Sequence, residues 1–148
     1  MNNSKNQLID NQQARIFDAS EILRSHGIYP TAQRVCLANM LLAKNQHMTA
    51  EQIYEGIRND DLKVSQATVY NTLGLLVQKG LLHEIFVDST KTFYDSNIRP
   101  HQHFYNVDTG ALTDIRQAVP TGFLRDELPS GVALDSIDVI VRIKNLAS

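Results

Sequence analysis

Histidines and aspartates are the residues of this chain whose types and spacing best suit metal chemistry. His101 and His103 stand two residues apart in a segment that reads as a strand, so both side chains point to one face. Asp114, on the expected partner strand, shares the face of His103, and Asp95 ends the strand before this segment. His47 lies in an expected loop between the helical half and the sheet. Imidazoles and carboxylates without a thiolate favour Fe(II), Mn(II) or Zn(II) over Cu(I), although a solvated histidine pair has the same spacing.

A second group of residues suits contacts with DNA. One face of an expected helix carries short polar groups, a methyl group and a phenol: Ser65, Gln66, Ala67, Thr68, Tyr70 and Asn71. Glutamine and asparagine can pair with adenine, and alanine or threonine methyl groups can pack on the thymine methyl group. Arg34 and Lys63 would add phosphate contacts. Many solvated helix faces have this composition, so the pattern alone leaves both interpretations open.

Composition limits the classes of protein that this chain can be. Its 148 residues, 43% of them hydrophobic and 20% charged, predict one domain or two small ones that share a core. The net charge is −2, so the protein as a whole does not attract nucleic acid by positive charge. Any contact with DNA must come from a local basic patch. The single cysteine, Cys36, excludes an intramolecular disulfide and fits a reducing cytoplasm. The sequence contains no stretch of about 18 apolar residues, the length needed to span a membrane. We therefore expect a cytoplasmic protein without a membrane partner.

Helical periodicity fills the first half of the chain. Helices are expected over residues 12–25, from the cap Thr31, from the capping box that opens at Thr49, and from Ser65 to Gly80. Residues 82–87 and 91–95 then alternate as a hairpin. Helices followed by a hairpin are the order of a winged helix-turn-helix, whose last helix enters the DNA major groove.

Strand patterns dominate the second half. Residues 101–115 are expected to form a second hairpin, in which a two-residue loop at Thr109 and Gly110 places Tyr105 opposite Asp114. Residues 135–143 alternate as a strand, and residues 120–129 allow only a short helix. A small sheet with little helical cover leaves an apolar face, which indicates dimerisation.

Short motifs over about residues 28–115 resemble the ferric uptake regulator family of bacterial metalloregulators. The matching segments are Pro30 to Arg34, His47 to Glu51, Ala67 to Leu73, Gly80 to Leu82, Lys91 to Asp95, His101 to His103, and Asp114 with Ile115. The resemblance implies an α+β homodimer with a winged-helix DNA-binding domain at residues 1–95, including an arm at 1–11, and a small α/β dimerisation domain at residues 96–148. It implies a regulatory metal site at their junction, with the ligands His47, Asp95, His101, His103 and Asp114.

Departures from the family pattern indicate which branches of the family this chain resembles. Asn106 and Thr109 stand where the family carries a Cys-x-x-Cys motif, so no structural zinc is expected there. The two aspartates resemble the peroxide regulator branch, in which bound iron oxidises a ligand histidine. The missing cysteines and the short tail resemble the iron response regulator branch, which is associated with haem or iron. Haem held by His101 and His103 is the alternative cofactor, although the Cys-Pro haem motif of that branch is absent.

The expected function is therefore a metal-responsive repressor that binds a double-stranded DNA operator as a homodimer, with Fe(II) or Mn(II) as the physiological metal and Zn(II) in a purified sample. The alternatives are a haem-responsive regulator, a winged-helix regulator that needs no metal, and a metalloenzyme that activates water at the same residues. The sequence offers no further acid–base pair, nucleophile motif or glycine-rich phosphate loop for an enzyme. We expect no catalytic residue.

Overall fold

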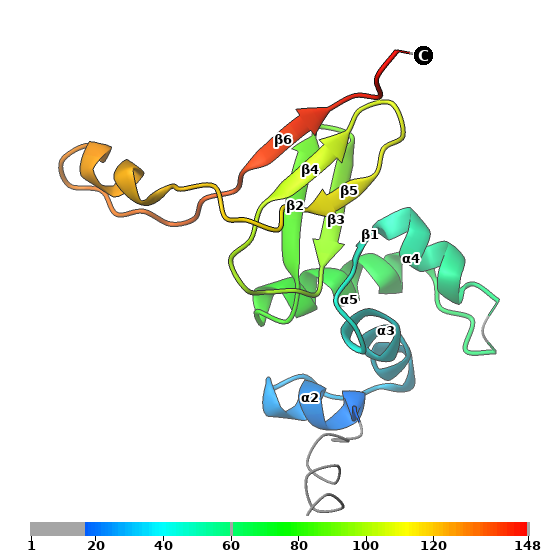
Figure 1. The fold of residues 1–148 in the computed structure, drawn as a ribbon. Coiled ribbons are helices and arrows are strands. Elements are labelled where there is room, and N and C mark those ends of the chain that lie inside the picture. The colour runs from blue at the N-terminus through cyan, green and yellow to red at the C-terminus, as the bar shows by residue number, and fades with distance from the viewer. Residues whose placement is uncertain (1–16, 60, 148) are drawn as a thin grey trace, which may run out of the picture.

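The computed structural model describes residues 17–59 and 61–147 (Figure 1). The arm expected at residues 1–11 and residues 12–16 of the expected first helix lie outside this part. In chain order the described elements are α2 (Ala19–Ser25), α3 (Ala32–Leu42), β1 (His47–Thr49), α4 (Ala50–Ile57), α5 (Gln66–Gln78), β2 (His83–Asp88), β3 (Lys91–Asp95), β4 (His103–Asn106), β5 (Leu112–Asp114), the 3-10 helix η1 (Gly122–Glu127) and β6 (Ile140–Ile143). We call the described elements from α2 to β3 the head, and β4, β5 and β6 the second sheet.

Side-chain caps determine where the helices of the head begin. Thr31, Thr49 and Ser65 each accept a hydrogen bond from the backbone amide three residues later, which satisfies a donor that has no partner within the helix. These three predicted helix starts are confirmed. The first described helix differs from its prediction, because Asp18 is an extended N-cap and α2 begins only at Ala19.

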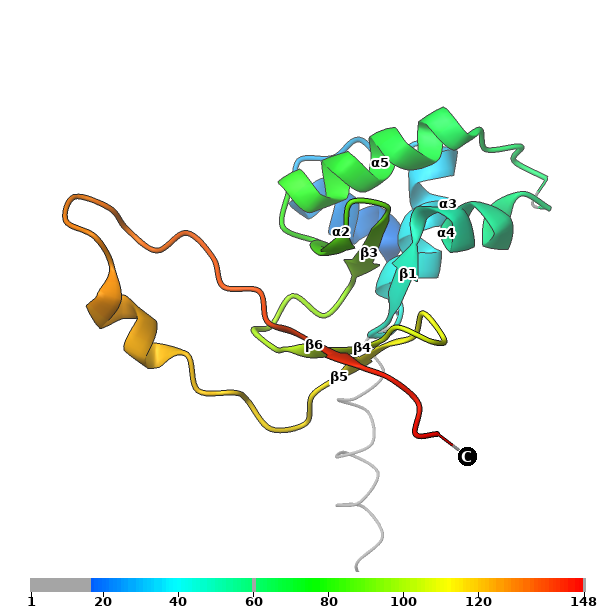
Figure 2. The same cartoon turned by 90° about the horizontal axis from the view of Figure 1, so that it is seen from above.

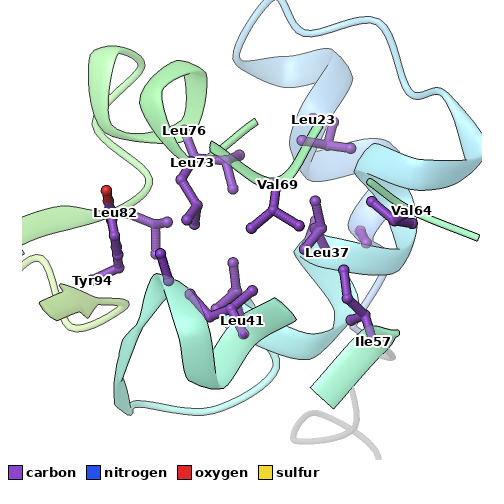
Figure 3. Close-up of a cluster of buried hydrophobic side chains, with 14 of the residues drawn as sticks. Leu23, Leu37, Leu41, Ile57, Val64, Val69, Leu73, Leu76, Leu82 and Tyr94 are labelled. Atoms are coloured by element: carbon purple, nitrogen blue, oxygen red, sulfur yellow. The ribbon is translucent and has the colours of Figure 1, made fainter. Parts of the chain in front are cut away.

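The helices of the head pack around one apolar core. Leu37 of α3, Ile53 of α4 and Val69 and Leu73 of α5 are fully buried, and Figure 3 shows Leu37, Val69 and Leu73 pointing toward one another. Burying one such side chain stabilises the fold by about 1.5–3 kcal/mol. This packing fixes the orientation of α5, whose polar face is turned away from the core.

The sheet of the head has the strand order β1-β3-β2, and both pairs are antiparallel. The hairpin of β2 and β3 is the predicted wing, so the helices and this hairpin form the predicted winged helix-turn-helix of an α+β protein. The position of His47 differs from its prediction. It opens the strand β1 opposite Asp95 instead of lying in a loop, and three residues are too few for alternation to reveal a strand.

The second sheet has the order β5-β4-β6, with β5 antiparallel and β6 parallel to β4. The predicted register of its hairpin is wrong by two residues, because His103 lies opposite Asp114, and Tyr105 lies opposite Leu112. A two-residue shift leaves each side chain on its predicted face. His101 is not part of the strand, since β4 begins at His103.

A longer turn between β4 and β5 explains this register. The Asn106 amide donates to the carbonyl of Ala111 at 2.9 Å, so the predicted two-residue loop is four residues long. The Asn106 side-chain oxygen accepts the amides of Asp108 and Thr109 at 2.9 and 3.2 Å. The Asn106 side-chain nitrogen donates to Asn145 near the C-terminus at 2.9 Å. One amide side chain therefore fastens both the turn and the chain end.

The strand predicted over residues 135–143 is wrong in its first half. Only Ile140–Ile143 is paired, parallel to β4, and His103 is the partner of Ile140. The His103 amide donates to the Val139 carbonyl at 3.2 Å, and since β4 begins at His103, residues 135–138 have no neighbouring strand to pair with. Before β6, residues 115–139 form an arm that extends away from the second sheet and carries η1 (Figures 1 and 2).

One face of the second sheet is covered by the head itself. Ile85, Val87 and Phe93 of the wing pack with Tyr105 and Leu112, and the partly buried Ile140 joins them: this set is the shared cluster. The apolar face of this sheet was expected to indicate dimerisation, whereas the chain itself covers one face. Val141 and Ile143 of β6 alternate with Ile140, so they lie on the other face of the sheet, where they are 37% and 39% exposed. The domain boundary at residue 95 stays a prediction.

Among the described residues, no helix has the length and apolar character needed to cross a membrane.

Candidate metal centre and DNA-facing helix

Ligand atoms from four strands meet where the head contacts the second sheet. His47 opens β1 opposite Asp95 at the end of β3, and His103 opens β4 opposite Asp114 at the end of β5. One ligand atom from each of these four residues lies within 4.8 Å of the other three. These are four of the five predicted ligands, two from the head and two from the second sheet, and the fifth, His101, contacts Asp95 and Asp114 as well. We call all five the junction cluster.

Hydrogen bonds within the junction cluster cross between the head and the second sheet. His47 Nε2 lies 2.8 Å from Asp114 Oδ1. His103 Nε2 lies 3.1 Å from Asp95 Oδ2 and 3.3 Å from Asp114 Oδ1. Asp95 and His103 are 1% and 4% exposed, whereas the Asp114 side chain is 46% exposed. One side of the cluster thus faces solvent, while its inner ligands are shielded from it.

His101 reaches the same two carboxylates from the linker between the sheets. Its Nε2 lies 2.7 Å from Asp95 Oδ2 and 3.4 Å from Asp114 Oδ1. Its Nδ1 donates to the Arg99 carbonyl at 2.6 Å. Burial would lower the pKa of His101, but this carbonyl and the two carboxylates together raise the pKa above its ordinary value. The hydrogen bond at Nδ1 orients the ring so that Nε2 points to the cluster.

Asp95 holds its negative charge although it is almost completely buried. Burial would raise the pKa of Asp95, yet hydrogen bonds from His103, from the Asn97 amide at 2.8 Å and from His101, with the nearby His47, lower the pKa. A charged carboxylate surrounded by imidazoles is a ready anionic ligand.

The donor set fits a divalent transition-metal ion. Imidazole nitrogens and carboxylate oxygens without sulfur suit Fe(II), Mn(II) and Zn(II). The donors already converge on one centre, and each cluster hydrogen bond joins two groups that are both metal ligands when deprotonated. At the expected position of a structural zinc motif, Asn106 and Thr109 instead belong to the turn between β4 and β5.

His83 makes a contact that the sequence did not reveal. Its Nε2 lies 2.9 Å from Asp138 Oδ1 at the end of the arm. In the head sheet His83 lies opposite Asp95, so this pair is a second polar tie between the head and the segment before β6. The two residues are 55 positions apart, and no local pattern signals such a contact.

Helix α5, which carries most of the predicted DNA-contacting residues, lies on the side of the head opposite the second sheet (Figure 2). Gln66, Tyr70 and Asn71 are exposed, and Tyr70 is 50% exposed. Ser65 is exposed, but its hydroxyl caps the helix and lies 3.0 Å from the hydroxyl of Thr68. Thr68 is half-buried, so its side chain offers less to a ligand than the predicted role assumed.

The basic residues assigned to phosphate contacts lie outside this helix. Arg34 is half-buried in α3, and its Nη1 donates to the Tyr29 carbonyl at 3.0 Å. Lys63 is exposed in the loop before α5, where its φ of +45° is unusual for a residue other than glycine. Both remain predicted contacts.

Comparisons with known proteins agree with this architecture. A model of the ferric uptake regulator family matches residues 25–137. The peroxide-responsive repressor PerR of Staphylococcus saprophyticus is 29% identical over 97 residues, which are 66% of this chain and 66% of that protein. The matched segment covers just under two thirds of the length of this relative and of the PerR of Staphylococcus aureus.

Solved structures share the fold. The manganese-containing ferric uptake regulator of Pseudomonas aeruginosa superposes with a TM-score of 0.68 at 24% identity, covering 87% of this chain and 98% of that one. The peroxide stress regulator of Campylobacter jejuni superposes with a TM-score of 0.58 at 25% identity, covering 88% of this chain and 98% of that one.

A winged-helix head, a small second sheet and a histidine–aspartate centre between them define a two-part protein with a candidate metal site at its junction. The chain belongs to the ferric uptake regulator family.

Proposed function

We propose that this protein is a metal-responsive, sequence-specific DNA-binding regulator, most simply a repressor that responds to iron or peroxide. One observation carries the proposal: the ligands of the junction cluster come from both the DNA-facing head and the second sheet. A metal ion bound there would therefore sense how the head is oriented. The family membership and the peroxide-responsive name of the curated relatives support the same class of function.

Residues from both the head and the second sheet would hold the metal ion. A bound divalent ion would supply positive charge, which the two carboxylates would neutralise and the imidazole nitrogens would coordinate. His47 and Asp95 hold the head side, while His103 and Asp114 hold the sheet side. His101, in the linker, contributes a nitrogen that the Arg99 carbonyl keeps in place. Ligands shared in this way favour one orientation of the head over others.

A homodimer would convert that orientation into recognition of an operator. Two heads related by a twofold axis must match half-sites about one helical turn apart or a related spacing. The exposed outer positions Val141 and Ile143 offer the second sheet a face for a second copy. We therefore keep the predicted division at residue 95, with residues 96–148 as the dimerisation part, and a cytoplasmic location next to the DNA.

A metal ion fits the cluster better than haem or catalysis does. The side chains of His101 and His103 are 14% and 5% exposed and face two carboxylates, which leaves little apolar space for a porphyrin. The grooves of about 620 and 430 Å³ both lie in the helical part of the head, and no cluster residue lines either of them. This arrangement supports a binding role over an enzymatic one.

Metal-dependent DNA selection tests the proposal directly. The full chain is stripped with a chelator, reloaded with Mn(II), and offered a random library of double-stranded DNA. We expect an enriched sequence with two related half-sites and an affinity that changes with Mn(II) by about 5- to 150-fold, the usual range for coupled sites. Bound manganese is quantified in the same samples.

Two histidine variants make the test specific. His103→Ala removes a cluster ligand, whereas His26→Ala removes an exposed imidazole at the end of α2. We expect His103→Ala to lose both bound manganese and the metal response, and His26→Ala to keep both. The proposal is wrong if no sequence is enriched, or if all three proteins respond to Mn(II) alike.

A further inference from the structure

The contact between the head and the second sheet is ordered in three rows along the strands. The first row is the junction cluster, at Asp95 and His103. In the second row, Phe93, two residues before Asp95, and Tyr105, two residues after His103, belong to the apolar shared cluster. Lys91 forms the third row. It lies two residues before Phe93, at the opposite end of β3 from Asp95. Since strand side chains alternate with a period of two, all three rows face the same contact.

Lys91 crosses this contact from the head to the second sheet. Its Nζ lies 3.4 Å from the carbonyl of Gly110 in the turn between β4 and β5. The ammonium also lies 5.5 Å from the ring centre of Phe93 and 5.6 Å from that of Tyr105, within the range of cation–π attraction. A Cβ at Gly110 would lie 2.6 Å from Nζ, so the absence of a side chain there makes room for the lysine.

Arg142 crosses the same contact in the opposite direction. It extends from β6, donates through Nη2 to the Val87 carbonyl in the wing, and lies 5.7 Å from the ring centre of Tyr105. Tyr105 is therefore next to two cations, one from each side of the interface. Each cation donates to a backbone carbonyl of the other half, so neither contact needs a metal ion.

We propose that Lys91 and Arg142 are positioning residues which, with the shared cluster, form a metal-independent latch between the wing and the second sheet. This latch holds the orientation of the head at one end of the interface, while the junction cluster acts at the other end. In the wild-type protein the metal-free head then stays docked, and metal tightens an arrangement that already exists. Without the latch, head orientation depends on metal alone. The regulatory consequence of this inference rests on the proposed function, whereas the docking itself does not.

Hydrogen exchange measured by mass spectrometry tests the docking without DNA. The test protein is the full chain with Lys91→Gln and Arg142→Gln, which remove both charges and keep polar side chains of moderate length. The matched control carries Lys144→Gln and Arg116→Gln, two exposed positions of the same residue types. In excess chelator, we expect amides in residues 83–95 and 103–114 to exchange about tenfold faster in the test protein than in the control, because the cation–π contacts of both residues are lost. Added Zn(II) should restore most of the protection.

Conservative replacements and DNA affinity separate positioning from simple stability. Lys91→Arg with Arg142→Lys should recover protection, because both cations return. The ratio of DNA affinity with and without Mn(II) should rise about tenfold in the glutamine variant, whereas loss of a direct phosphate contact would weaken both affinities equally. Unchanged exchange in chelator, or fast exchange that persists in the protein with Lys91→Arg and Arg142→Lys, would overturn the latch. Faster exchange that Zn(II) does not restore would count against the junction metal site instead. If exchange behaves as expected and no DNA binds, the latch stands and the proposed regulator function fails.

Discussion

Asn substitution at two aspartates of the junction cluster tests the role of burial in the metal-free protein. Asp95 is 1% exposed and accepts hydrogen bonds from His101, His103 and the Asn97 amide at 2.7, 3.1 and 2.8 Å. Asp95→Asn keeps an oxygen for the Asn97 amide, but it removes the charge and points an amide nitrogen toward the imidazoles. Asp114→Asn makes the same chemical change at a side chain that is 46% exposed.

The expected cost differs between the two positions because their solvation differs. Hydrogen bonds to a charged group are each worth about 1.5–3 kcal/mol, and Asp95→Asn weakens two of them inside the protein, so we expect a loss of about 3 kcal/mol. Water partly replaces the contacts of Asp114, and exposed ion pairs contribute about 1 kcal/mol or less. At about 2–4 °C per kcal/mol for a chain of this size, Tm should fall by roughly 6–12 °C for Asp95→Asn and by less than about 4 °C for Asp114→Asn.

Thermal and urea unfolding of both variants at pH 7 in excess chelator measure these costs. Chelator is essential, because both residues are proposed ligands and metal would add a second effect. Equal Tm values for the two variants would refute the argument that the buried carboxylate is the structural centre of the cluster. A larger loss for Asp114→Asn would refute it as well.

In chelator, the stabilising effect of His101, whose pKa is raised, should be complete below about pH 6.5 and disappear as pH rises through its folded-state pKa; unfolding between pH 5.5 and 9 should show this slope, and His101→Gln should remove it. Gln66→Ala should weaken binding to the selected operator by about 1–3 kcal/mol, whereas Gln78→Ala at the other end of α5 should not; equal losses would contradict base reading at Gln66. Thr49→Ala breaks the capping box of α4 and should cost about 1 kcal/mol in urea unfolding, and no loss would show that the cap is replaced by water.

Local rules predicted the features that depend on neighbouring residues. Thr31, Thr49 and Ser65 cap their helices as expected, because the cap needs only an oxygen and an amide three residues later. The common face of His103 and Asp114 was also predictable, since alternation along a strand survives a register error of two residues.

The length of one turn and the contacts between distant segments were not predictable from the sequence. The side chain of Asn106 lengthens a turn that a glycine signal alone had made too short. The packing of Phe93 on Tyr105 and the pairing of His83 with Asp138 join segments with no shared pattern. For the same reason the covered face of the second sheet was missed, because nothing in one strand shows which other strand will lie against it.

The Asn106 turn has a consequence for an organism under oxidative stress. A zinc site built on a Cys-x-x-Cys motif depends on thiolates and a bound ion, which oxidation or a strong chelator can remove. Here the Asn106 side chain binds two amides of the turn and reaches Asn145, and neither peroxide nor a chelator attacks an amide readily. The turn between β4 and β5 is therefore held by hydrogen bonds that involve neither sulfur nor a bound ion, so oxidation or chelation would leave these contacts in place.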